Sequence, residues 1–388
     1  MRFSRSFEAS PHCLPSPHGK LVATLSASTI HIRSIDSLRT VRHISLPRDF
    51  TGPVAFFQWS SSSRLILVAS VDQIHVFSAV EDGFHATIRS PVPPAAKPVF
   101  IGFGPSDTQA WSGPQVLIAA DADINLGPGA KVVEFSADAR LLAIGDSSRR
   151  ICILDMASVT ESRRLQHPNS ITPTDALQVW QEQVGSSGHH FVRALQTIYP
   201  PNGQTTGNTQ PQSGCAIMAF DISSALLATK LDDAPSTIWI WDTTTAELRA
   251  VLLFHGNISK ISWHPTIRET LLVVSEGDSY NSLAFIWDPL SSGPKPIDLS
   301  GRLTNSKLQL HWLNVSGLEP GALFASDSRQ YLLASLAVDE DEPVPWSSDG
   351  ESSTMLSDNS QHVTTAHTDD DSEGEASELD DTFCFKKA

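Results

Sequence analysis

One pattern recurs along most of the chain and constrains its fold more than any other feature. An apolar segment ends in an aromatic residue, a short polar turn follows, and a second apolar segment comes next. Clear copies read VAFFQWSSSSRLILVAS at 54–70, KVVEFSADARLLAIG at 131–145 and ISKISWHPTIRETLLVVS at 258–275. Short apolar or alternating runs on both sides of a tight polar turn predict pairs of β-strands.

The spacing of the copies predicts how the strands are organised. Seven residues end the first segment of a full or partial copy: Pro15, Trp59, Phe103, Phe135, Phe220, Trp263 and Trp312. The successive spacings are 44, 44, 32, 85, 43 and 49 residues. Most lie near the length of about 40–45 residues that is typical of a four-stranded propeller blade. The sequence therefore predicts an all-β WD-repeat β-propeller of about seven blades, one of them incomplete, over residues 1–337.

The third strand of each unit ends in a related pair of residues. It reads HIRS (31–34), HVFS (75–78), CILD (152–155), WIWD (239–242) and FIWD (285–288), so the pairs include Leu154-Asp155, Trp241-Asp242 and Trp287-Asp288. Alternation along this strand places Trp239 and Trp241 on one sheet face. We expect the tryptophans to pack between sheets and the aspartates to accept backbone N–H groups in a turn. We therefore expect these residues to stabilise the fold, and we expect functional residues on the rims and in the loops of the propeller.

Two intervals depart from the repeat. The long one contains an excess near 184–214 that is rich in Gly, Ser, Gln, Thr and Pro, which predicts a flexible insertion preceded by an outer strand at 176–184. It contains His189 and His190, a pair that has no metal ligands spaced nearby. The short interval predicts an irregular blade over about 104–130, which would leave the face of Trp59 uncovered.

The two ends of the repeat region predict how the ring closes. The last copy runs out after YLLASLAV (331–338), and the segment RFSRSF (2–7) precedes the first copy without a blade of its own. Unpaired strand edges are unfavourable in all-β folds. We therefore expect residues 2–7 to pair with the last blade.

Charge is concentrated at the C-terminal end. The formal net charge is −16, and residues 339–388 contain 15 acidic residues and two lysines, which predicts a disordered acidic tail over 338–388. Within it, 369–380 resembles an EF-hand loop but has no flanking helices and has Ala376 at position 8. Ser372 and Ser377 each have an acid three residues on and are candidate sites for acid-directed kinases, while a purely solubilising tail is the simpler alternative.

The rest of the sequence argues against several functional classes. There is no nucleophile, metal or phosphate-loop motif, so we expect no enzyme and no cofactor, although an active site spread over several blades would escape this search. Outside the tail the acidic and basic residues nearly balance, which argues against nucleic acid as a ligand. We find no secretion signal or membrane span, and the four cysteines lie far apart.

Three segments resemble the WD-repeat protein eight family: FSRSFEASPHCLPSPHGKLVATL at 3–25, LQHPNSITPTDALQVWQEQ at 165–183 and IMAFDISSALLATKLDDAPSTIWIWDTTTAELRAVL at 217–252. The resemblance implies a scaffold at the spindle pole body or centrosome that organises the mitotic spindle. The implied partners are a coiled-coil microtubule-anchoring protein and, in fungi, a kinesin-14 motor, which together tether microtubule minus ends. The chain looks like a fungal member with a shortened middle, since FGPSD runs directly towards AWSGP where the family has further repeats.

An alternative is a general WD-repeat adaptor such as a substrate receptor of a ubiquitin ligase. The adaptor-binding motif of such receptors needs Arg two residues after the WD aspartate. Thr244 and Leu290 stand there, which weakens this alternative.

Overall fold

The computed structural model describes residues 1–50, 52–70, 72–83, 85–89, 100–103, 110–113, 130–158, 160–186, 188–201, 214–277, 283–303, 308–315, 321–337 and 342–346. The chain divides into two compact units, Met1–Ser347 and Ser348–Ala388, and every described residue lies in the first. The expectations for Ser372, Ser377 and the segment 369–380 therefore fall outside the described residues.

The described residues form 29 β-strands in seven sheets. Sheet 1 contains β3 (Cys13–Pro15), β4 (Leu21–Ser26), β5 (Thr29–Ser34) and β6 (Thr40–Ser45), and sheet 2 contains β7 (Phe56–Trp59), β8 (Leu65–Ala69), β9 (Gln73–Ser78) and β10 (His85–Arg89). Sheet 3 pairs β11 (Phe100–Phe103) with β12 (Ala110–Gly113). Sheet 4 contains β13 (Ala130–Phe135), β14 (Leu141–Asp146), β15 (Arg150–Asp155) and β16 (Thr160–Gln166).

Sheets 5 and 7 have additional strands. Sheet 5 contains β19 (Cys215–Phe220), β20 (Leu226–Leu231), β21 (Thr237–Asp242) and β22 (Leu248–Leu253), extended by β17 (Gln178–Gly185) and β18 (Gly188–Arg193). Sheet 6 contains β23 (Asn257–Trp263), β24 (Leu271–Glu276), β25 (Leu283–Trp287) and β26 (Lys295–Asp298). Sheet 7 contains β27 (Gln309–Leu313), β28 (Ala322–Ser326) and β29 (Gln330–Ser335), joined by β1 (Arg2–Phe3) and β2 (Phe7–Glu8).

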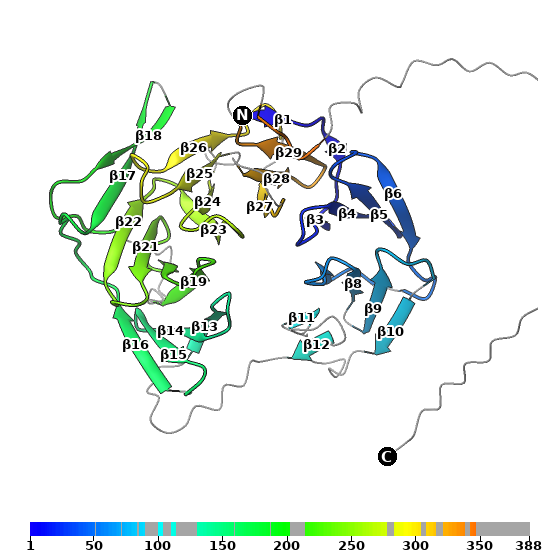
Figure 1. The fold of residues 1–388 in the computed structure, drawn as a ribbon, viewed down its shortest axis with the longest axis horizontal. Helices are drawn as coiled ribbons and strands as arrows, with labels where there is room; N and C mark the ends of the chain where they lie inside the picture. Colours follow the sequence, from blue (N-terminus) through cyan, green and yellow to red (C-terminus); the bar gives the residue numbers. More distant parts are fainter. Residues whose placement is uncertain are drawn as a thin grey trace, which may run out of the picture. The chain divides into compact units, whose positions relative to one another are not determined.

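Successive sheets lie side by side in this first unit (Figure 1), and their apolar faces form its core. Trp239 and Trp241 contribute to a buried cluster with residues of sheet 4, such as Ile153. Ile238 and Ile240, on the other face of β21, lie in a cluster with residues of sheet 6. Both faces of sheet 5 are therefore buried, as the alternation predicts, because this sheet lies between sheets 4 and 6.

The N-terminal strands pair with the last sheet, as expected from the unpaired ends. Arg2 and Phe3 of β1 are opposite Ser335 and Ala334 of β29, and β2 continues the pairing with Phe7 opposite Tyr331. Residues from the start and the end of the sequence thus share one sheet. This pairing supplies the outer strands that the last repeat lacks.

The folded unit extends beyond the boundary at residue 337 that the sequence suggested. The Arg2 guanidinium donates a hydrogen bond to the carbonyl oxygen of Glu342. Trp346 packs against the cluster that contains Phe7 and Tyr331. An aromatic side chain in an otherwise acidic segment gains apolar contacts there, so residues 342–346 belong with the sheets.

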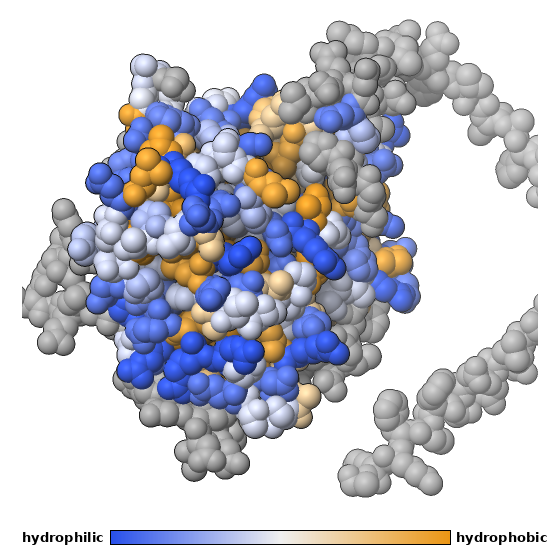
Figure 2. Space-filling model, turned by 60° about the vertical axis from the view of Figure 1, so that its left-hand side comes forward, coloured by the Kyte–Doolittle hydropathy of each residue, from blue (hydrophilic) through white to orange (hydrophobic). Residues whose placement is uncertain are grey.

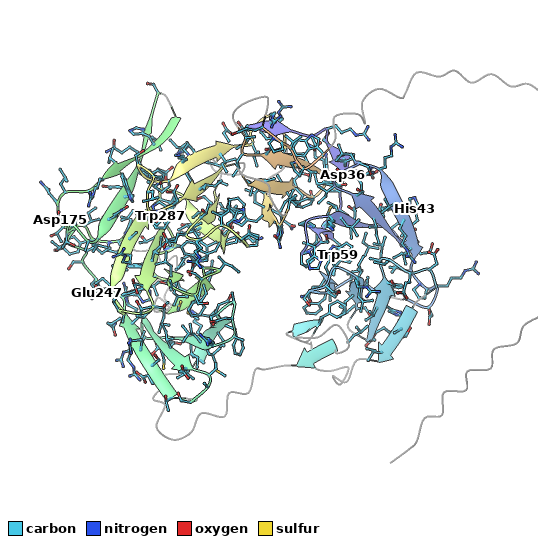
Figure 3. All side chains as sticks on the ribbon, in the orientation of Figure 1. Asp36, His43, Trp59, Asp175, Glu247 and Trp287 are labelled. Carbon is cyan, nitrogen blue, oxygen red and sulfur yellow. The ribbon has the colours of Figure 1, made fainter. Side chains whose placement is uncertain are left out.

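The aromatic residues that mark the repeat connect neighbouring blades. The indole Nε1 atoms of Trp59, Trp263 and Trp312 donate to the carbonyl oxygens of Leu14, Ala219 and Ser262, at 3.1, 2.8 and 3.1 Å. The acceptors lie on β3, β19 and β23, each in the preceding sheet. The expectation that an incomplete third blade would uncover Trp59 is wrong, because its ring faces sheet 1 and is 4% exposed (Figure 3).

Two further expectations concern the irregular intervals. Sheet 3 has two described strands, and most of the interval 104–130 lies outside the described residues. The interval 184–214 is only partly the loop that its composition suggested, because residues 188–193 form β18, which pairs with β17. Among the described residues there is no helix long and apolar enough to cross a membrane.

Candidate interaction surface

The turn after the third strand is held in every clear repeat by a side-chain oxygen at its first position. Asp242 Oδ1 accepts the N–H groups of Thr244 and Thr245 at 2.9 and 3.0 Å, and Asp155 Oδ1 accepts those of Ala157 and Ser158 at 3.0 and 2.9 Å. The same position in the remaining repeats is occupied by Asp288, Ser34 and Ser78, whose oxygens accept from Leu290, Ser37 and Glu81. These residues stabilise turns.

The hydrogen bonds also explain the acidity of the turn aspartates. Donation from the backbone and hydroxyl of Ser158 lowers the pKa of Asp155. Burial alone would raise the pKa of Asp242, but donation from Thr244 and Thr245 outweighs it and the pKa is lowered. Leu154, next to Asp155, is buried in sheet 4. All the predicted pair positions thus have contacts within their own blade.

The Trp241 side chain belongs to a buried hydrogen-bond relay. Nδ1 of His167 lies 2.8 Å from the carbonyl oxygen of Arg149, which can only accept, so Nδ1 carries the proton. Nε2 then accepts from the Thr229 hydroxyl at 2.8 Å, and the Thr229 oxygen accepts from Trp241 Nε1 at 3.1 Å. Burial lowers the pKa of His167 to about 4, which keeps the ring in this neutral form.

Sheet 6 lacks the corresponding relay. Trp287 and Trp241 occupy equivalent places, since they are opposite Leu271 and Leu227 on the neighbouring strand. Two residues further along that strand, Val273 replaces Thr229. Trp287 Nε1 is consequently buried without a hydrogen-bond partner among the described residues. The two Trp-Asp pairs look alike in sequence, but their tryptophan side chains have different hydrogen bonds in sheets 5 and 6.

The clearest departure from a plain four-stranded blade is the hairpin of β17 and β18. β17 pairs in parallel with β22, with Gln178 opposite Ala250, so the hairpin extends the outer edge of sheet 5. Phe191 packs against Phe254 and Phe285, with ring centroids 5.3 and 5.5 Å apart. The hairpin is therefore fastened to the blade that follows it as well as to its own.

Two polar contacts and one glycine complete this attachment. The Glu182 carboxylate, in a residue that is 2% exposed, accepts the backbone N–H of His255 at 2.6 Å and lies 2.5 Å from His189 Nδ1. Gly293 has a φ of +103°, and a Cβ there would lie 2.9 Å from both Trp180 and Phe191. The hairpin thus approaches the turn between β25 and β26 so closely that a side chain has no room.

The segment that follows β18 exposes apolar side chains. Ala194 and Ile198 pack against the core, while the intervening Leu195 and the next residue, Tyr199, are 89% and 72% exposed. An antiparallel bridge joins Ile198 to Ile171. We call the exposed set Leu195, Thr197, Tyr199 and Thr172 the lateral patch. It lies on the outer side of sheet 5, where Figure 3 places the neighbouring Asp175, and Figure 2 shows apolar areas interrupting the polar surface on this side.

The structure corrects the interpretation of His189 and His190. His189 is not an isolated loop residue, because it contacts the buried Glu182 within the hairpin, whereas His190 is exposed. No group of three or more His, Cys, Asp or Glu side chains arranged for a metal occurs in the described part of the chain. Burial raises the pKa of the Cys13 and Cys215 thiols to about 12.

Comparisons with known proteins agree with the architecture. No family model matches the sequence. A stretch of 96 residues, 25% of the chain, is 28% identical to the WD repeat-containing protein WRAP73 of Mus musculus, and spans 19% of that protein's length. The β-propeller domain of Myceliophteria thermophila Cps50 (Swd1) matches with a TM-score of 0.50, over 86% of this chain and 100% of that domain, at 12% identity.

This chain has the fold of a WD-repeat β-propeller. WD-repeat propellers are typically non-enzymatic scaffolds for protein interactions. In this propeller the predicted pair residues Trp241, Asp242, Trp287 and Asp288 stabilise blades, which leaves recognition to the exposed segments. The lateral patch has no clear signal in the sequence, because its alternation covers few residues within a region of loop-like composition.

Proposed function

We propose that this WD-repeat propeller is a non-catalytic protein-binding scaffold of the spindle pole body or centrosome, where it helps to anchor microtubule minus ends. The proposal is supported by the resemblance of residues 3–25, 165–183 and 217–252 to the WD-repeat protein eight family. The proposed partner is a coiled-coil microtubule-anchoring protein, joined in fungi by a kinesin-14 motor.

One observation carries the assignment of the binding surface: the exposure of Leu195 and Tyr199 on a segment that is itself fastened to the core. Isolated exposed apolar residues are ordinary, but Leu195 and Tyr199 lie four residues apart on one ordered segment, next to an added hairpin, and a group of exposed apolar residues marks a candidate recognition surface. Apolar side chains of this kind can receive the apolar face of a partner helix. The segment is ordered before binding, so little entropy is lost when a partner docks.

The experiment is affinity purification from mitotic cells with mass spectrometry, together with imaging of a fluorescent fusion. The wild-type protein is expected to form a focus at the poles and to recover a coiled-coil partner. Leu195→Ser with Tyr199→Ser should lose the partner, because both apolar contacts are removed. The control is Val41→Ser, which removes an exposed apolar side chain from β6 of sheet 1. A uniform distribution of the fluorescent fusion in mitotic cells contradicts the proposal. Equal recovery of the partner by the double variant and by Val41→Ser contradicts it as well.

A further inference from the structure

The sequence contains four Ser/Thr-Pro dipeptides, at Ser10, Ser16, Ser90 and Thr172. Ser90 lies outside the described residues. Ser16 is buried and its Oγ accepts the N–H of Leu21 at 3.1 Å, and Ser10 is half-buried with its Oγ accepting from His12 at 3.1 Å. Among the three described positions, Thr172 alone is exposed.

The backbone at Thr172 has the form in which protein kinases take their substrates. Ile171 makes a single antiparallel bridge with Ile198, so the chain is extended there. Pro173 disfavours helical conformations at the preceding residue and so keeps Thr172 extended. The segment lies on the outer surface of sheet 5 (Figure 3 labels the nearby Asp175), and the described hydrogen bond of the Thr172 side chain joins its hydroxyl to that of Thr197 at 3.0 Å.

The surroundings provide donors for a phosphate. A guanidinium nitrogen of Arg193 lies 3.4 Å from the carbonyl oxygen of Thr174, which places a cation beside the same segment. The Thr197 hydroxyl can turn from Thr172 Oγ1 to a phosphate oxygen without moving its backbone. A phosphorylated threonine carries a charge of about −1.5 to −2 and has three strong acceptor oxygens, which these two donors match.

The geometry points to Thr172 as a phosphorylation site for a proline-directed protein kinase, with Arg193 and Thr197 holding the phosphate. Thr172 Oγ1 attacks the γ-phosphorus of ATP, the bond from that phosphorus to the β,γ-bridging oxygen breaks, ADP leaves, and the hydroxyl proton passes to the kinase. The modification puts a dianion beside Thr197, within the lateral patch. It therefore releases an apolar partner from that patch, a consequence that rests on the proposed function.

The site itself is tested without any partner. Purified full-length protein is incubated with a proline-directed kinase and ATP, and the modified residues are located by tandem mass spectrometry. Modification at position 172 is expected in wild type and in Thr172→Ser, and its loss in Pro173→Ala, whose circular dichroism should match wild type. Phosphate found only at Ser10, Ser16, Ser90 or the acidic segment overturns the assignment.

Two further measurements test the phosphate contacts and the release. The second pKa of the phosphothreonine, followed by ³¹P NMR, should lie about half a unit lower in wild type than in Arg193→Gln; equal values overturn the role of Arg193. Phosphorylated protein should recover at least roughly tenfold less partner than unmodified protein, a change of about 1.4 kcal/mol. If the phosphorylated protein recovers as much partner as the unmodified protein, only the proposed release is wrong. Failure of the proposed function is recognised separately, because the unmodified Leu195 and Tyr199 variants would then recover as much partner as wild type.

Discussion

Replacing Thr229 by valine tests whether the relay under Trp241 stabilises the propeller. The substitution preserves the branched shape and replaces the hydroxyl by a methyl group. The hydroxyl accepts from Trp241 Nε1 and donates to His167 Nε2. Both groups are buried and would be left without a partner. Because an unsatisfied buried polar group costs about 1–3 kcal/mol, we expect the free energy of unfolding to fall by about 2–4 kcal/mol.

Two comparison variants separate the hydroxyl from packing. Thr229→Ser retains the hydroxyl and removes one methyl group, so it should cost about 1 kcal/mol. The reciprocal change Val273→Thr places a hydroxyl where Trp287 Nε1 lacks a partner, and should raise the free energy of unfolding by about 1 kcal/mol.

The assay is urea denaturation followed by tryptophan fluorescence, with the midpoint compared at constant slope. Thr229→Val should have the lowest midpoint of the four proteins and Val273→Thr the highest. Equal midpoints for the valine and serine variants would refute the reasoning, because loss of the hydroxyl would then cost no more than loss of one methyl group.

Three further predictions follow from the fold. The folded-state pKa of His167 is about 4, below its unfolded value of 6.5, so its contribution is fully present above pH 6.5 and is lost as the pH falls towards 4; the urea midpoint should drop over this window, and less so in His167→Gln. A chain ending after Ser347 should melt like wild type, whereas one ending after Ala337 should melt several degrees lower because it lacks the tryptophan that packs beside Phe7; identical melting curves would contradict this. Gly293→Ala should displace the β17–β18 hairpin at a cost of about 2–3 kcal/mol, seen as faster proteolysis near 185–188, and unchanged cleavage would show that the close approach is not required.

Much of the architecture follows from periodicities that are local in sequence. Strands alternate every two residues, so the faces of Trp239 and Trp241 could be predicted without knowing their neighbours. Turn aspartates such as Asp242 bond to N–H groups two and three residues on, which is equally local. The pairing of residues 2–7 with the last blade followed from the general rule that strand edges are paired, once the repeats had been counted.

Contacts between distant residues were decided only by the tertiary structure. The sequence contains His167 and Thr229 but no signal that a relay joins them, because the two residues lie 62 positions apart and meet only when consecutive blades pack. The parallel pairing of β17 with β22 has no local pattern, and composition therefore suggested a loop where β18 forms. The sequence by itself determined the repeating unit and its turns, since these depend on neighbours along the chain. Packing between blades decided how the insertion attaches and which of its side chains remain exposed, since these depend on surfaces that exist only after the ring has formed.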